Sequence, residues 1–304
     1  MIALIKKILF HDKWNIGIVN CSVQDVINGQ DISAKNITWL PEIYGRYSAD
    51  PFLFEQGDKL WLFFEDFSYK TNTAQLAVTE VILGEEVSFG DTHNILDSSV
   101  HRSYPYVFSV NEDVFLVPEQ CETGEVVLYE AESFPLKWKK KKTLLNNFAG
   151  VDATPFFHEG QWWMFVSELG DYENEELHLY FTQDITGIWV GHPQNPIVKN
   201  AQGARMAGNI YKDKHTQKIY RKGQDCTHTY GGGLVMYHIE TLTQKEYKEI
   251  QIQYIAPPKK YKQGIHTISH CDGKQLIAVD AKRWASLGEV IIKLFVVLKE
   301  RIKK

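Results

Sequence analysis

Short apolar runs separated by polar turns recur along the chain at intervals of roughly 45 to 60 residues. The first unit joins two apolar runs, 52–54 and 60–64, through a polar turn at 56–58, and this combination predicts a tight β-hairpin. Similar hairpins are predicted within 103–119, 151–168, 205–221 and 264–279. Because no hairpin can bury both of its faces alone, five copies predict a five-bladed β-propeller, in which each four-stranded blade packs against the next.

Segments outside the hairpins supply the remaining strands. Apolar stretches at 73–81, 126–129, 177–181 and 231–237 predict outer strands of the first four blades. A strand predicted at 14–19 is expected to pair with the last blade and close the ring. Residues 22–47 lack periodicity and are expected to form a loop that leads to the first hairpin. The propeller is therefore predicted to occupy residues 14–286 as one all-β domain.

The two ends of the chain differ from its centre, and short terminal helices are expected there. Residues 1–13 form an N-terminal amphipathic segment, and residues 287–304 carry apolar side chains at helical spacing before a basic cluster. We expect the C-terminal segment to be a basic amphipathic helix packed on the propeller, with contact to a membrane surface as an alternative. Its β-branched residues leave a final strand as a further alternative.

Composition narrows the compartment and the partners. A formal net charge of −5 argues against nucleic-acid binding, which requires neutralisation of phosphates. The four cysteines are isolated, which is typical of reduced thiols, and residues 1–10 are too short for a membrane span and lack a signal-peptide cleavage site. We expect a cytoplasmic protein, which in the membrane alternative lies peripherally on the inner face. No cofactor and no metal are expected, since the sequence lacks a P-loop, a dinucleotide fingerprint and zinc-ligand spacing.

Acidic residues open two of the hairpins. Asp50 stands directly before Pro51, and Asp152 holds the matching place in the third hairpin. A charge at the mouth of a buried strand is either solvated or used, so both carboxylates are candidate functional groups, with capping of a strand or turn as the alternative for Asp50. Three glutamates are predicted to hold matching places at the ends of second strands: Glu65, Glu119 and Glu168. Blade architecture explains this repetition, although Glu119 is also a candidate acid.

Basic residues near the hairpin starts are candidate substrate-binding groups: Arg46, His101, Arg102, Arg205 and His266. Each of them has a structural alternative, because a lone histidine is more often hydrogen-bonded within the fold and an arginine is often paired with a carboxylate.

The motifs that carry these residues resemble two groups of proteins. The hairpins that begin at Asp50-Pro51 and at Val151-Asp152-Ala153 resemble the five-bladed propellers of glycoside hydrolase family 43, which includes arabinanases and furanosidases. The runs Ala49-Asp50-Pro51-Phe52-Leu53-Phe54, Gln224-Asp225-Cys226 and Tyr230-Gly231-Gly232 look more closely like the domain at the N-terminus of glucosamine inositolphosphorylceramide transferases. The second resemblance covers about residues 14–285.

The hydrolase resemblance implies an aspartate nucleophile or base in blade one, an aspartate that tunes protonation in blade three and a glutamic acid in blade four. Asp50 and Asp152 match the first two roles, but the segment expected to hold the glutamate reads Ala204-Arg205-Met206. A phosphate leaving group needs charge stabilisation rather than a proton, and an arginine can supply it through bidentate hydrogen bonds. Arg205 therefore favours transfer from a phosphate-activated donor.

We thus expect a glycosyltransferase that acts in the assembly of surface polysaccharide or glycolipid. Its donor would be a sugar phosphate or nucleotide sugar, with a furanosyl or phosphoribosyl unit included, and its acceptor a glycan or lipid-linked glycan. Asp50 would serve as nucleophile or base. Two alternatives stay open: a hydrolase or phosphorylase of the family 43 type that uses Glu119 or another displaced acid, and a propeller that binds carbohydrate without catalysis.

Overall fold

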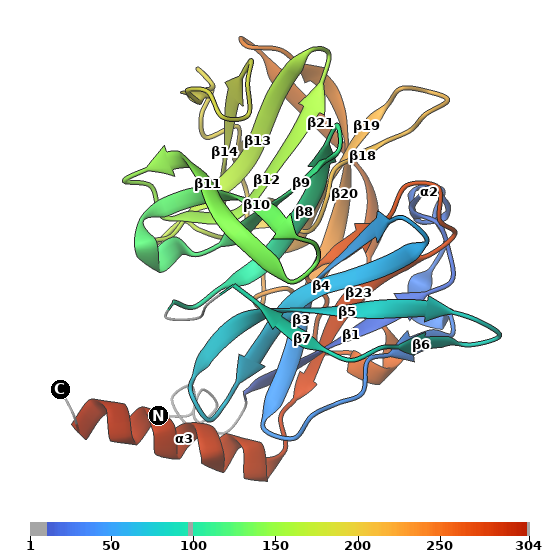
Figure 1. Ribbon diagram of the computed structural model, residues 1–304. Coiled ribbons are helices and arrows are strands. Elements are labelled where there is room, and N and C mark those ends of the chain that lie inside the picture. The colour runs from blue at the N-terminus through green and yellow to red at the C-terminus, as the bar shows by residue number, and fades with distance from the viewer. Residues whose placement is uncertain (1–10, 97–99, 303–304) are drawn as a thin grey trace.

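The computed structural model describes residues 11–96 and 100–302 of the chain. Five antiparallel sheets of four or five strands are arranged around a central axis, so the predicted five-bladed β-propeller is confirmed (Figure 1). The first strand of each blade lies next to the axis, and later strands lie progressively farther out.

The blades follow one another along the chain. Blade one contains β3 (Arg46–Gln56), β4 (Lys59–Ser68), β5 (Thr73–Leu83), β6 (Val87–Phe89) and β7 (His93–Ile95). Blade two contains β8 (Ser103–Val110), β9 (Asp113–Glu119), β10 (Glu125–Ser133) and β11 (Lys137–Asn146). Blade three contains β12 (Gly150–His158), β13 (Gln161–Glu168), β14 (Glu176–Thr182), β15 (Val190–Gly191) and β16 (Val198–Lys199). Blade four contains β17 (Gln202–Met206), β18 (Tyr211–Lys212), β19 (Ile219–Asp225), β20 (Gly233–Leu242) and β21 (Tyr247–Ile255).

Blade five is built from both ends of the propeller. Its inner strands are β22 (Ile268–His270) and β23 (Ile277–Trp284), and β1 (Asp12–Val19) pairs with β23 in an antiparallel register from Asp12–Trp284 to Val19–Ile277. This pairing confirms that the N-terminal strand closes the ring.

The expectation of a plain loop before the first hairpin is wrong. That segment holds α2 (Val23–Ile27), the 3₁₀ turn η1 (Ile32–Ala34) and β2 (Ile37–Trp39), which is the outer strand of blade five. Ser22 accepts a hydrogen bond from the Asp25 backbone and Asp25 accepts one in return, so a capping box starts α2. A five-residue helix and a three-residue strand are too short to produce a recognisable period.

Large apolar side chains fill the spaces between blades. Phe52 and Phe63 of blade one, Tyr104 of blade two and Phe165 of blade three are almost completely buried in one cluster. The rings of Phe52 and Tyr104 meet edge to face with their centroids 4.8 Å apart, which joins two blades near the axis.

The first strands of three blades share a local distortion. Asp50, Tyr104 and Asp152 have φ angles of 51°, 45° and 52°, and in each strand the register with its neighbour shifts at this position. Positive φ is costly for residues other than glycine, and such strain persists where the surrounding structure enforces it, often at functional sites. The shared bulge brings these three residues to the axis at the end of the propeller where the first strands begin.

The C-terminal segment forms the helix α3 (Leu287–Ile302), as expected, and Figure 1 shows it at one end of the molecule, beside the propeller. Buried Glu289 accepts hydrogen bonds from Lys13 and from the Gly45 backbone, and Val290 is buried, so the first turns of α3 are fixed to blades five and one. Residues 1–10 of the predicted N-terminal amphipathic segment lie outside the described residues. Among the described residues, no helix is long and apolar enough to cross a bilayer.

Candidate active site

Charged side chains gather on the axis at the end where the first strands begin, and nearly all of them are buried. The group comprises Asp50, Glu65, Glu119, Asp152, Arg205, His266 and Asp280, contributed by all five blades. Five carboxyl groups thus share this space with a guanidinium and an imidazole. Burial disfavours the charged form of each acid. A buried cluster of titratable groups is typical of catalytic and binding sites.

Asp50 is held at the centre of this group. Its carboxylate accepts hydrogen bonds from the Thr267 hydroxyl, at 2.8 Å, and from the Tyr104 backbone N–H, at 3.2 Å. His266 Nε2 lies 3.4 Å from Asp50 Oδ1. Burial raises the pKa of Asp50 to about 6, with His266 opposing this rise and Asp152 adding to it. At neutral pH Asp50 is therefore mainly ionised but close to its titration range.

Asp280 supports Asp50 and His266. It accepts hydrogen bonds from the backbone N–H groups of Asp50 and His266, at 2.9 and 3.0 Å, and from that of Thr267. Its Oδ2 also lies 2.6 Å from His266 Nδ1. Burial lowers the pKa of His266, but Asp280 and Asp50 outweigh burial and raise it above its usual value. The imidazole, stacked on Trp14 at 3.9 Å, therefore favours the positively charged form.

Asp50, His266 and Asp280 place ligand atoms within 4.8 Å of one another, an arrangement that can hold a metal ion. The oxygens of Asp280 are already engaged by three backbone N–H groups and by the imidazole. A protonated His266 can supply the positive charge that a metal would otherwise bring. Asp280 was not identified from the sequence, although an acidic residue within the apolar run 276–281 is a signal that could have found it.

Arg205 joins the carboxylates of blades two and three. Its Nε donates to Asp152 Oδ2 at 2.6 Å, and its Nη2 donates to Glu119 Oε2 at 3.5 Å. Burial raises the pKa of Asp152 to about 7 although Arg205 lowers it. The Tyr230 ring covers the guanidinium at 5.0 Å. Arg205 is thus paired with carboxylates within the fold, as its structural alternative expects. Contact between Arg205 and a phosphate stays a prediction.

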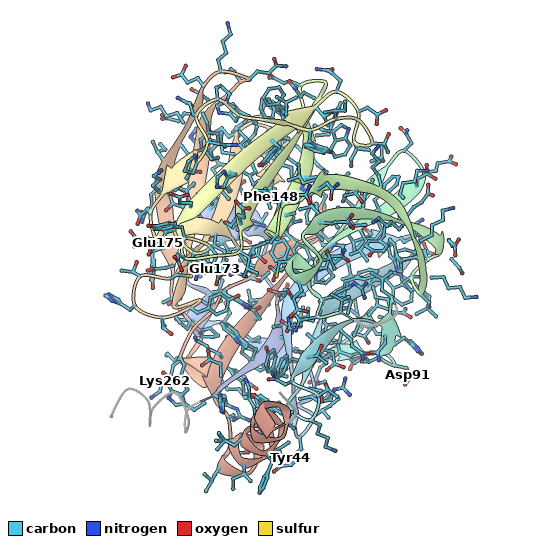
Figure 2. All side chains as sticks on the ribbon, turned by 90° about the vertical axis from the view of Figure 1, so that its left-hand side faces the viewer. Tyr44, Asp91, Phe148, Glu173, Glu175 and Lys262 are labelled. Atoms are coloured by element: carbon cyan, nitrogen blue, oxygen red, sulfur yellow. The ribbon has the colours of Figure 1, made fainter. Side chains whose placement is uncertain are left out.

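The remaining edge of the guanidinium faces the β13–β14 loop. Arg205 Nη1 donates to Asn174 Oδ1 at 3.3 Å and lies 3.9 Å from Glu173 Oε1, both longer than the contact with Asp152. Figure 2 shows Glu173 and Glu175 close together on this loop. Nη1 donates to a neutral amide, so an anion at this edge would not have to displace Asp152 or Glu119 from Arg205.

Three other candidates have partners within the fold. Arg46 forms a bidentate pair with Asp66, His101 Nδ1 accepts the Ala74 backbone N–H at 3.2 Å, and Arg102 donates to Gln120 at 3.2 Å. These contacts match the structural alternative for each residue, and a role in substrate binding stays a prediction for all three.

The prediction that three glutamates hold matching places is wrong for one of them. Glu65 pairs with Ala49 and Glu119 with Ser103, each directly before the bulge, whereas the residue that pairs with Val151 is Ser167. Glu168 is one position further on and is exposed, because a shift of one residue moves a side chain to the other face of a strand. Glu65 is buried among the acids, and burial raises its pKa well above the usual value.

The raised pKa of Asp50 predicts a pH-dependent stability difference. In the folded state Asp50 holds a proton up to about pH 6, whereas an unfolded aspartate loses it near its ordinary pKa of 3.8. Asp50 therefore makes the free energy of unfolding fall as pH rises through this window. Asp50→Asn removes this effect. As the pH rises from about 4 to about 7, the free energy of unfolding of the mutant should increase by about 2–3 kcal/mol relative to that of the wild type.

Urea denaturation of both proteins at the two pH values measures this difference. Asp58→Asn, which alters an exposed carboxylate in the β3–β4 turn, is the matched control and should show little change. A mutant that loses relative stability as pH rises would contradict a raised pKa at Asp50.

Comparison with known proteins gave one matching family and several relatives. The family described as glucosamine inositolphosphorylceramide transferase 1, N-terminal, matches residues 36–288. Glucosamine inositolphosphorylceramide transferase 1 of Oryza sativa subsp. japonica is 34% identical over 252 residues, which are 81% of this chain and 32% of that protein. The protein of the same name from Arabidopsis thaliana is 34% identical over 238 residues, 76% of this chain and 31% of that protein. The chain therefore spans about a third of the length of these relatives.

Solved structures with a similar fold include glycoside hydrolases. An exo-β-1,3-galactanase from Clostridium thermocellum has a TM-score of 0.56 at 10% identity, over 70% of this chain and 53% of that one. A family 117 glycoside hydrolase from Zobellia galactanivorans has a TM-score of 0.54 at 11% identity, over 92% of each chain. At such low identity the likeness concerns the fold alone.

Proposed function

Because the chain belongs to the family of the N-terminal domain of glucosamine inositolphosphorylceramide transferase 1, we propose that it acts in glycosyl transfer. In this proposal a sugar moves from a phosphate-activated donor, such as a sugar phosphate or nucleotide sugar, to a glycan or lipid-linked glycan. The named relatives are transferases about three times as long as the matched region, so the assignment of the chemistry to this domain is part of the proposal.

The observation that supports a reaction here is the state of Asp50. Its carboxyl group is buried, stands on a strained backbone and has a pKa of about 6, while His266 and Thr267 fix its orientation. A carboxylate with these properties is suited to attack an anomeric carbon or to take a proton from an acceptor hydroxyl. Asp50 is therefore proposed as nucleophile or base.

Arg205 is proposed to stabilise the phosphate that leaves. Asp152 and Glu119 orient the guanidinium through Nε and Nη2, and a phosphate would replace the contacts of Nη1 with Asn174 and Glu173. An anion at this edge would meet a fixed positive group without rearrangement of the pair with Asp152.

A second candidate function is hydrolysis or phosphorolysis of a glycoside. The observation that favours it is the pair of Asp152, whose pKa is about 7, and the adjacent buried Glu119, whose Oε2 accepts the Asp152 backbone N–H at 3.2 Å. A carboxyl group that is half protonated at neutral pH can act as the acid that ordinary glycosides require.

A ligand screen separates these functions. Purified protein would be tested for thermal stabilisation by nucleotide sugars, sugar 1-phosphates, phosphoribosyl pyrophosphate and neutral oligosaccharides, and each ligand that binds would then be incubated with acceptors and its products identified. A phosphorylated donor at a hundred times its Kd is expected to add about 2.7 kcal/mol to the free energy of unfolding. Stabilisation by neutral oligosaccharides alone would contradict the transfer proposal, and binding without turnover would indicate a carbohydrate-binding propeller.

The β13–β14 loop offers a matched pair of variants for this screen. Glu173→Gln removes a negative charge 3.9 Å from Arg205 Nη1, and affinity for a phosphorylated donor should rise roughly two- to fivefold while affinity for neutral sugars stays constant. Glu175→Gln, an exposed change on the same loop (Figure 2), should alter neither. Equal effects of the two variants would argue against phosphate binding at this edge of Arg205.

A further inference from the structure

Exposed apolar side chains lie on α3 and on the segment before β3, and the two segments meet where Tyr44 reaches Gly288. We call the surface made by Ile43, Tyr44, Leu287, Ile291 and Phe295 the α3 patch. Leu287 and Phe295 are 69% and 71% exposed, and with Ile291 they follow each other at intervals of four residues along one side of the helix. Tyr44 packs against Gly288 and lies beside α3 in Figure 2. The patch therefore combines a helix stripe with a neighbouring loop.

The opposite side of α3 is the one that binds the propeller. Val290 is buried, Ile292 packs with Phe67 and Tyr69, and Lys293 lies over the Phe67 ring at 5.3 Å. Because these contacts fix the helix, its apolar stripe cannot turn inward without undocking the helix. The α3 patch is thus a permanent outward-facing surface of the described structure.

Basic side chains lie near the patch. Lys259, Lys260 and Lys262 are exposed, and Figure 2 shows Lys262 at the same end of the molecule as Tyr44. The neighbouring acids Glu42 and Glu289 are already paired with Arg283 and Lys13. In a chain with a net charge of −5, this end favours an anionic partner.

The patch lies at the same end of the blades as the carboxylate group. Tyr44 lies in the turn before β3, six positions from Asp50, and even a fully extended chain would limit their distance to roughly 20 Å. α3 follows β23, the strand that carries Asp280. A flat partner that touches the patch would therefore stand at the end of the blades where the carboxylate group lies.

We propose that the α3 patch docks on the surface of an anionic lipid bilayer and brings the candidate site close to that bilayer. The apolar stripe enters the headgroup region, and the lysines contact anionic headgroups. If the proposed glycosyl transfer is correct, the docking also specifies its acceptor as a glycan carried on a lipid of the same bilayer. This statement about the acceptor rests on the proposed function. The docking itself can be measured without any substrate.

The test is sedimentation of the full chain with vesicles of phosphatidylcholine alone and with vesicles in which one third of the lipid is phosphatidylglycerol. The wild type is expected to sediment with the anionic vesicles and to stay in solution with the neutral ones. The double variant Ile291→Ser, Phe295→Ser should bind the anionic vesicles roughly tenfold or more weakly, because less apolar area enters the bilayer. The substitutions Lys259→Glu, Lys260→Glu and Lys262→Glu should each weaken binding to the anionic vesicles by roughly fivefold.

Phe157→Ser is the matched control, because Phe157 is 56% exposed at the turn end of β12, away from Asp152, and its replacement should leave vesicle binding unchanged. A wild type that stays in solution with both vesicles overturns the proposal, and so does an equal loss in the control. Self-association that the serine variant abolishes, without vesicle binding, would instead assign the patch to a second copy of the chain. Because the assay records no turnover, its failure would leave the transfer chemistry standing.

Discussion

Replacing Asp50 with asparagine should lower kcat/KM by roughly a thousandfold on any donor and acceptor pair that the wild type converts. Asparagine retains the size of the side chain and tolerates a positive φ, so the bulge at this position is expected to persist. The variant loses the carboxylate that would act as nucleophile or base, together with its negative charge beside His266. Initial rates at several substrate concentrations measure the effect, and circular dichroism checks the fold.

Glu168→Gln serves as the control for this loss, since Glu168 is an exposed carboxylate at the end of the equivalent second strand in blade three. Its turnover should match that of the wild type. Full turnover by Asp50→Asn would remove Asp50 from the chemistry and would leave the Asp152–Glu119 pair as the place to look for the reacting group.

Replacing Arg205 with alanine should lower the free energy of unfolding by about 3–5 kcal/mol. The change leaves Asp152 and Glu119 buried next to each other without their shared cation. Urea denaturation at neutral pH measures the loss. Adding Asp152→Asn to Arg205→Ala should recover part of it, because the buried acid that Arg205 contacts at 2.6 Å is then replaced by a neutral amide.

Arg283→Ala is the comparison for this prediction. Arg283 also forms an ion pair, with Glu42, but its side chain is 35% exposed, so its loss should cost only about 0–1 kcal/mol. Equal losses in Arg205→Ala and Arg283→Ala would show that the buried group tolerates separated charges and that the acids around Arg205 take up protons instead.

The fold was predictable because its unit is local. The hairpin of the first blade can be recognised from residues Asp50 to Phe64 alone, where an acidic residue, a proline and two apolar strands follow each other. The same pattern recurs in later blades. Ring closure was predictable for a related reason, since an apolar strand that precedes the first unit has its natural partner in the last blade.

The site was only partly predictable because its contacts are not local. Asp50 and Asp152 stand out at the hairpin starts, but Asp280 accepts the backbone N–H of Asp50, which lies 230 residues away along the chain, and no spacing rule reveals that. Glu168 shows a second limit, because matching it with Glu119 required knowing on which residue the bulge falls. The pairing of Arg205 with both Asp152 and Glu119 likewise depends on how three blades face the axis.

The pairing of β1 with β23 has a consequence for biosynthesis. The groups that hold Asp50, namely His266, Thr267 and Asp280, lie in the last part of the propeller to leave the ribosome, while the edge of β1 is made first and must wait for its partner. A nascent chain can form the middle blades early, but the constellation around Asp50 is complete only when the last strands arrive. A chain that ended before β22 would therefore lack both the strand that pairs with β1 and the groups that hold Asp50. The candidate site can thus form only after the ring can close.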